Sequence, residues 1–105
     1  MLGARYTGRV AWRRRYASRH YVGYVVVGDN SVRLAGDEHG TGIHAVLSIP
    51  SGAIRQTRVG RDSAEEIVGK PGIVLELADD DPIYLRPIRP GTLGVDELAR
   101  KLRFT

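Results

Sequence analysis

The stretch IVLELADDDPIYLR, residues 73–86, decides the fold. Two short runs rich in β-branched, leucine and aromatic residues flank three aspartates and a proline. Runs of this composition suit a pleated sheet, and the polar cluster between them is typical of a turn. We therefore predict strands at 72–78 and 83–86, joined by an exposed hairpin turn. Pro87 and Pro90 end the sheet, because proline cannot donate to the strand ladder.

After this hairpin the apolar residues follow a helical period instead of alternating. They fall at i, i+3, i+4 and i+7 and form one stripe: Val95, Leu98, Ala99 and Leu102. Arg100, Lys101 and Arg103 lie late in the segment, where positive charge is favourable to the helix dipole. The pattern predicts a helix over residues 92–103, with Thr92 as its N-cap.

Upstream of residue 72 the chain shows repeated strand patterns separated by glycine-rich or polar segments. Five further strands are expected, at 5–12, 20–27, 31–35, 43–49 and 53–59. Alternation in the first strand places Trp12 and Val10 on the face that packs into the core. The polar segment 60–71 contains Ser63-Ala64-Glu65-Glu66, a capping-box pattern that predicts one helical turn at most.

Hairpin spacing predicts three antiparallel pairs: 20–27 with 31–35, 43–49 with 53–59, and 72–78 with 83–86. No helix longer than two turns is expected between residues 20 and 59.

At 105 residues the chain is long enough for one domain with a single core, residues 1–105. Short antiparallel strands bury their apolar faces only when the sheet curls or splits into two packed layers. We predict a mainly β fold with one C-terminal α-helix, a partly open seven-stranded antiparallel barrel capped by that helix. The alternative is a smaller barrel of five or six strands, with residues 1–19 as a basic arm outside the core.

The sequence resembles the pleckstrin-homology (PH) superfold, in particular its bacterial, GRAM-like branch. The resemblance lies in the order of elements, in Ile49-Pro50-Ser51-Gly52-Ala53-Ile54 after a strand, and in Ile73-Val74-Leu75-Glu76-Leu77 before an acidic turn. Eukaryotic members usually carry a tryptophan on the C-terminal helix, whereas the only tryptophan here is Trp12. The resemblance implies a non-enzymatic binding or adaptor module.

Positive charge is concentrated at the N-terminal end of the chain. The net charge is +4, yet residues 1–28 contain six arginines and no acid. A block of this kind creates a local field that attracts phosphate groups. In phosphoinositide-binding members of the PH family, the loop between the first two strands binds the head group. The resemblance therefore implies an anion-binding loop, with these candidate residues: Arg13, Arg14, Arg15, Ser18, Arg19 and His20.

The conformation of this run decides how its arginines act. On a strand, Arg13 and Arg15 would share one face and Arg14 the other. In a turn, all three could converge with Arg19 on one anion. The competing interpretation is a solvated basic loop, or charge that protects a sheet edge against pairing.

Aromatic residues interleave with the arginines: Tyr6, Trp12, Tyr16, Tyr21 and Tyr24. This pattern also occurs in proteins that bind single-stranded nucleic acid, where aromatic rings stack on bases and arginines follow the phosphates. Nucleic-acid binding through the basic N-terminal third is therefore the alternative function. The plainer interpretation is that these aromatic side chains pack in the core.

The sequence contains no recognised motif for catalysis or for binding a metal or cofactor. The chain has no cysteine, and the three histidines, His20, His39 and His44, lack the spacing of a recognised metal site. No nucleophile elbow or phosphate loop is present, so we expect neither an enzyme nor a resident cofactor or metal.

The expected partners are an anionic lipid surface or a protein, with nucleic acid as the alternative and a homo-oligomer as a further arrangement. No apolar run approaches the roughly 20 residues of a membrane span, and no apolar stretch near Met1 predicts a secretory signal. We expect a cytoplasmic protein, with peripheral attachment at the inner membrane face as a further location.

Overall fold

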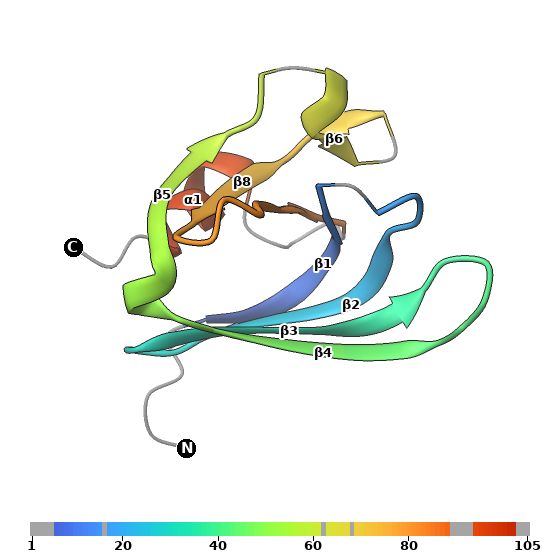
Figure 1. The fold of residues 1–105 in the computed structure, drawn as a ribbon, viewed down its shortest axis with the longest axis horizontal. Helices are drawn as coiled ribbons and strands as arrows, with labels where there is room; N and C mark the ends of the chain where they lie inside the picture. Colours follow the sequence, from blue (N-terminus) through green and yellow to red (C-terminus); the bar gives the residue numbers. More distant parts are fainter. Residues whose placement is uncertain (1–5, 16, 62, 68, 89–93, 103–105) are drawn as a thin grey trace.

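Strands dominate the computed structural model, which describes residues 6–15, 17–61, 63–67, 69–88 and 94–102 (Figure 1). The elements in chain order are β1 (Tyr6–Arg14), β2 (Tyr21–Val27), β3 (Ser31–Glu38), β4 (His44–Pro50), the 3₁₀ turn η1 (Ser51–Ala53), β5 (Ile54–Val59), the 3₁₀ turn η2 (Ser63–Glu65), β6 (Glu66–Ile67), β7 (Lys70–Pro71), β8 (Ile73–Leu77), β9 (Ile83–Pro87) and the helix α1 (Val95–Lys101). The prediction that 20–59 contains no long helix is confirmed, since the three-residue turn η1 is the only helical element in that range.

Seven of these strands form one antiparallel sheet in the order β4-β3-β2-β1-β9-β8-β5. The sheet curls into a half-barrel, and α1 lies on its concave side (Figure 1). The predicted mainly β fold with a C-terminal helix is confirmed. Two of the three predicted hairpins are also confirmed: β2 pairs with β3, and β8 pairs with β9.

The predicted pairing of 43–49 with 53–59 is wrong. Strand β4 pairs with β3, whereas β5 pairs with β8. The short turn η1 connects two halves of the sheet instead of closing a hairpin. Its first residue, Ser51, donates from its backbone N–H to Asn30 O at 2.8 Å, and its last residue, Ala53, accepts from the N–H of Ala78 at 2.8 Å. These two bonds hold the ends of η1 against different halves of the sheet, so the chain cannot fold back on β4.

The concave face of the sheet carries the main hydrophobic core. It includes Val10 and Trp12 of β1, as the alternation predicted. The Trp12 ring stacks on Tyr21 with centroids 4.5 Å apart, and its Nε1 donates to Ala35 O at 3.1 Å. Because β1 lies between β2 and β9, residues 6–14 belong to the centre of the sheet. The alternative with residues 1–19 as an arm outside the core is therefore wrong for the described residues.

Strands β2 and β3 approach each other closely at a pair of glycines. Gly23 and Gly36 are cross-strand partners. A Cβ atom built on Gly23 would lie 2.0 Å from the backbone oxygen of Ala35, which is the acceptor of the Trp12 indole. Any side chain at Gly23 would therefore push β3 away and break this contact.

Several element boundaries differ from the predictions. Strand β1 continues through Arg14 and β3 through Glu38, because alternation tolerates exposed polar residues that also occur in loops. The helix begins after an N-cap at Gly94, which has no side-chain cap; the predicted N-cap, Thr92, lies outside the described residues. The two-residue strands β6 and β7 form a small second sheet that the sequence patterns did not predict.

The helix completes the concave core. Leu98, Ala99 and Leu102 are buried in the same cluster as Trp12 and Val10, so the predicted apolar stripe is confirmed. The Thr57 hydroxyl of β5 donates to Leu102 O at 3.3 Å. No helix among the described residues is long and apolar enough to cross a membrane.

Candidate anion-binding face

The convex face of the sheet carries two neighbouring arginines at its centre. Residues of β1 alternate, so Val10 and Trp12 face the main core while Arg9 and Ala11 lie on the convex side, where Ala11 is buried in a second, smaller apolar cluster. Arg86 of β9 is the cross-strand partner of Ala11, and the N–H of Ile88 donates to Arg9 O at 3.4 Å. Arg9 and Arg86 are thus diagonal neighbours on one face, a spacing that long side chains can bridge.

The Nε atoms of both arginines are shut off from water without a partner. Among the described residues, neither Arg9 Nε nor Arg86 Nε has a hydrogen-bond acceptor. Neither side chain forms a salt bridge with a described carboxylate. A buried donor without a partner is unfavourable, and guanidinium groups bind carboxylate and phosphate oxygens in bidentate fashion. Both side chains are partly exposed apart from these buried atoms, so their guanidinium groups can meet an anion at the surface.

An exposed aromatic ring lies beside this pair. The Cζ atom of Arg9 lies 5.4 Å from the ring centroid of Tyr24, its cross-strand partner on β2. The Tyr24 side chain is exposed on the convex face. A cation over an aromatic ring is electrostatically favourable, so the ring positions the Arg9 guanidinium on the surface. Of the predicted packing aromatics, Trp12 is buried in the core, Tyr6 and Tyr21 pack against it, and Tyr24 is exposed; Tyr16 lies outside the described residues.

His20 borders the same basic region. Burial lowers the pKa of His20 from its ordinary 6.5, and the neighbouring charges of His39, Arg86 and Arg13 lower this pKa further. The His20 and His39 rings stack with centroids 4.8 Å apart. The cationic side chains around His20 thus oppose another positive charge, which is the electrostatic environment that favours a bound anion.

The first two arginines of the predicted loop lie on β1 and point in different directions. The Arg13 guanidinium lies over the Tyr84 ring at 4.7 Å and donates to Ala64 O at 2.6 Å and Glu66 O at 3.1 Å. Arg14 forms a salt bridge with Asp81 at 2.9 Å, in the β8–β9 turn. Because side chains alternate along the strand, these two point to opposite faces. The Arg13 side chain binds η2 and β6 to the sheet, and the Arg14 side chain binds the β8–β9 turn.

The rest of the predicted loop is spread along the same end of the sheet. Arg15 lines a hollow between β5, β8 and β9, whereas Ser18 and Arg19 are exposed. Arg19 donates to His39 O at 3.3 Å, and His20 directly precedes β2. The structure thus does not bring Arg13, Arg14 and Arg19 to one point. Anion binding by the individual loop residues stays a prediction.

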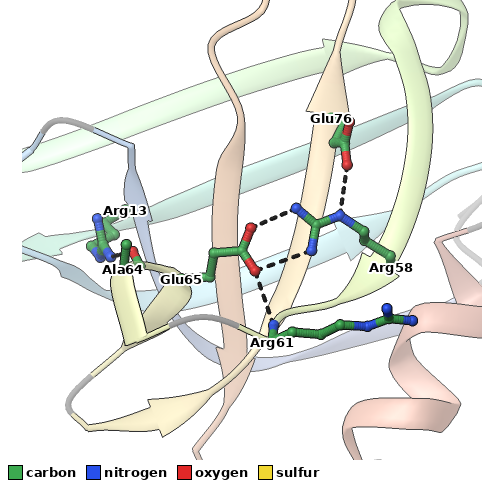
Figure 2. Close-up of polar contacts among 6 residues, drawn as sticks. All are labelled: Arg13, Arg58, Arg61, Ala64, Glu65 and Glu76. Atoms are coloured by element: carbon green, nitrogen blue, oxygen red, sulfur yellow. Dashed lines mark hydrogen bonds and ion pairs between the residues drawn. The ribbon is translucent and has the colours of Figure 1, made fainter.

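A second polar cluster lies in that hollow, whose volume is about 690 Å³. Arg58 of β5 donates to both carboxylate oxygens of Glu65, at 3.0 and 2.5 Å, and to Glu76 at 2.6 Å (Figure 2). Glu65 also accepts from the backbone N–H of Arg61 at 2.9 Å. The two carboxylates raise the pKa of Arg58. Because these acids already neutralise Arg58, the cluster holds η2 on β5 and is a weaker anion site than the Arg9 and Arg86 pair.

Arg86 and the role of Arg9 were missed by the sequence reasoning. The search for adjacent arginines selected the run at 13–15, and Arg86 lies more than 70 positions further along the chain. Alternation did carry a signal, because Arg9 and Arg86 both occupy outward positions of predicted strands. Only the β1–β9 pairing, however, places the two side chains next to each other.

Acidification is expected to weaken the fold through His20. Its folded-state pKa is lowered, so the unfolded chain binds this proton more tightly, and stability falls as pH drops through 6.5 toward the folded pKa. Urea unfolding at a series of pH values measures the effect. His20→Gln should flatten this part of the profile, whereas the matched change at exposed His44, which pairs with Asp37 at 2.8 Å, should leave it in place. An unchanged profile in His20→Gln would contradict the assignment.

Comparisons with known proteins extend to the fold only. No protein-family model matches the chain, and neither does any curated protein. Among solved structures, the chain is similar to the C-terminal domain of an unknown protein from Leishmania infantum. The TM-score is 0.63 at 16% identity, over 94% of this chain and 79% of that chain.

The fold and the convex face define a mainly β half-barrel protein with a basic outer surface. Within the described residues, no group of three histidine or acidic side chains could hold a metal ion.

Proposed function

We propose that this protein is a non-enzymatic binding module of the PH-like superfold that binds a phosphate-bearing lipid head group on the convex face of its sheet. The observation that carries the proposal is the pair of neighbouring, partly exposed side chains Arg9 and Arg86, neither of which forms a salt bridge with a described carboxylate. A phosphate binds such guanidinium groups through charge-assisted hydrogen bonds. The binding residues differ from the expected loop, although Arg9 belongs to the same N-terminal arginine block.

The PH-like assignment is supported by the order of the elements. Seven antiparallel strands form one curled sheet, and the helix that follows the last strand packs into its concave core. This agrees with the fold that the resemblance implies. The binding module is further supported by the asymmetry of the sheet, since the concave face builds the main core while the convex face carries Arg9 and Arg86 beside a smaller apolar cluster that includes Ala11.

The test is binding to vesicles of phosphatidylcholine with and without phosphatidic acid. We expect sedimentation with the anionic vesicles alone, and weaker binding when salt rises from about 50 to 200 mM. Arg9→Gln/Arg86→Gln should reduce affinity at least about tenfold, because each charge-assisted hydrogen bond is worth about 1.5–3 kcal/mol. Arg100→Gln removes an exposed charge from α1 and serves as the matched control.

Two results would contradict this proposal. One is equal loss of binding in Arg100→Gln and in the double variant, which would indicate a diffuse charge effect. The other is the absence of binding to the anionic vesicles at low salt.

The exposed Tyr24 ring favours a second candidate function. An exposed sheet face with an aromatic ring beside an arginine suits single-stranded nucleic acid, whose bases stack while arginine contacts the phosphate. The vesicle assay separates the two functions when it is repeated with an unlabelled single-stranded oligonucleotide. Displacement of the protein from vesicles by the oligonucleotide, together with loss of oligonucleotide binding in Tyr24→Ala, would assign nucleic acid as the partner.

A further inference from the structure

Strand β4 forms one end of the seven-stranded sheet, and no other described strand pairs with its outer side. Exposed sheet edges present unpaired backbone groups, and natural proteins usually protect them with charged residues, proline within the strand or a bulge. The stretch Ala45–Ile49 contains none of these: it reads Ala-Val-Leu-Ser-Ile, it has no charge, and its register with β3 is unbroken. Pro50 stands only at its end.

Strand β5, at the opposite edge of the sheet, has features that protect an edge strand against pairing with another chain. Strand β5 carries Arg55 and Arg58, and its register with β8 shifts between Ile54 and Gln56. The Thr57 hydroxyl of β5 donates to the carbonyl oxygen of Leu102, at the C-terminal end of the helix. The contrast between the two edges indicates that β4 is kept open for pairing.

The backbone groups available on β4 follow from its pairing with β3. Ile43 O accepts from the N–H of Glu38 at 2.8 Å, so Ile43 directs its backbone groups toward β3. In an antiparallel ladder the direction alternates from one residue to the next. His44, Val46 and Ser48 therefore present both N–H and C=O on the free side.

Of the three exposed large apolar side chains in the described part of the chain, one lies on β4 and another directly before it. Ile43 is 62% exposed, Val46 is 58% exposed, and the third, Tyr24, is 49% exposed. Tyr24, Ala35 and Val46 are successive cross-strand partners, so they form one row on the convex face that ends at the open edge. An apolar side chain on a neighbouring strand beyond β4 would continue this row and cover Val46.

We propose that β4 pairs antiparallel with β4 of a second copy of this chain, centred on Val46, so that two half-barrels share one continuous sheet. In this register Val46 faces Val46 of the second copy, and each His44 faces the other copy's Ser48. All outward N–H and C=O groups of these three residues are then used. The apolar row continues across the two-fold axis, and Ile43 lies opposite the second copy's Ile49.

Charge favours a second copy as the occupant. Asp37 is the cross-strand partner of His44, and Arg33 is the partner of Ser48. Pairing around Val46 therefore places Asp37 and Arg33 of the second copy in one row, with His44 and Ser48 between them, on both sides of the axis. The two charges lie three strand spacings apart, roughly 14 Å, so their attraction is modest; it favours this register over a parallel one, in which Asp37 would align with Asp37.

Sedimentation velocity of the full chain over about 1–200 µM tests the association. We expect the mass to rise with concentration from 11.6 kDa toward twice that value. Val46→Lys places two like charges at the axis and should weaken association at least about tenfold. Thr7→Lys adds the same charge at an exposed position of the convex face on β1 and should associate like the wild type. Equal circular dichroism spectra and melting curves establish that both variants are folded.

A cysteine scan tests the register, since the natural chain contains no cysteine. Partners in a hydrogen-bonded antiparallel pair have Cα atoms about 5.5 Å apart, within disulfide reach. Under mild oxidation Val46→Cys should form a covalent dimer, whereas Ser48→Cys, whose sulfurs would lie several residues apart, should not. A chain that stays monomeric throughout the concentration range, or cross-linking at Ser48→Cys in preference to Val46→Cys, would overturn the proposal. The Arg9/Arg86 double variant should dimerise normally, because these residues lie away from β4.

Discussion

Leu98→Ala is expected to lower the free energy of unfolding by about 2–5 kcal/mol. The Leu98 side chain has no exposed surface and lies in the main core cluster with Trp12 and Leu102. Truncating it removes buried apolar contacts and leaves a cavity between α1 and the concave face of the sheet. A loss of this size is a large fraction of the stability of a domain of 105 residues.

Urea unfolding followed by circular dichroism measures this loss. The matched control is Arg100→Ala, two positions along the same helix and exposed. Its effect should stay within about 0.5 kcal/mol, as for other surface substitutions. If Leu98→Ala and Arg100→Ala unfold at the same urea concentration, α1 contributes nothing to the core, and the capped half-barrel would be the wrong description.

Arg58→Ala is expected to cost about 2–3 kcal/mol, somewhat less than for a fully buried pair because the Arg58 side chain is 32% exposed. Removing the guanidinium takes two charge-assisted hydrogen bonds away from the Glu65 carboxylate, which is only 11% exposed and also accepts from the backbone N–H of Arg61. The cost arises because a nearly buried carboxylate loses its guanidinium partner. It should loosen η2 from β5 before it affects the rest of the sheet.

Strand β5 supplies the control for this prediction. Arg55 also forms a salt bridge, with Asp80 at 2.8 Å, but both of these side chains are mostly exposed. Arg55→Ala should therefore cost about 0–1 kcal/mol. Hydrogen exchange adds a local readout, because the backbone N–H of Arg61 should exchange faster in Arg58→Ala alone. Equal stability of the two variants would show that the Arg58 cluster is no more than a surface ion pair.

The sequence predicts that the candidate site is basic and rich in arginine. It does not predict which arginines form the site or where on the sheet they lie. An arginine-rich segment without acids, residues 1–28, does indicate a basic surface. Which arginines are available, however, depends on their acceptors. Arg13 binds carbonyl oxygens of η2 and β6, and Arg14 binds Asp81; both partners are more than 50 positions away along the chain. Arg9 and Arg86 form a pair only because β1 and β9 are neighbours.

Local patterns in the chain were sufficient for the elements themselves. The alternation of Val10 and Trp12, the acidic turn before Ile83 and the helical stripe through Leu98 each depend on neighbouring residues, and each prediction is confirmed. Periodicity and turn chemistry act over a few residues, so one sequence contains them in full.

Strand pairing over long distances was decided by the tertiary structure alone. Alternation in 43–49 and 53–59 is equally compatible with pairing to each other and with the observed partners β3 and β8. The choice follows from backbone bonds at both ends of η1, to Asn30 and Ala78, and from the burial of both strands on one concave core. Such contacts join residues about 20 or more positions apart, and their free energy exists only once the whole sheet has curled. For this reason the open β4 edge and the convex pair Arg9 and Arg86 are properties of the fold.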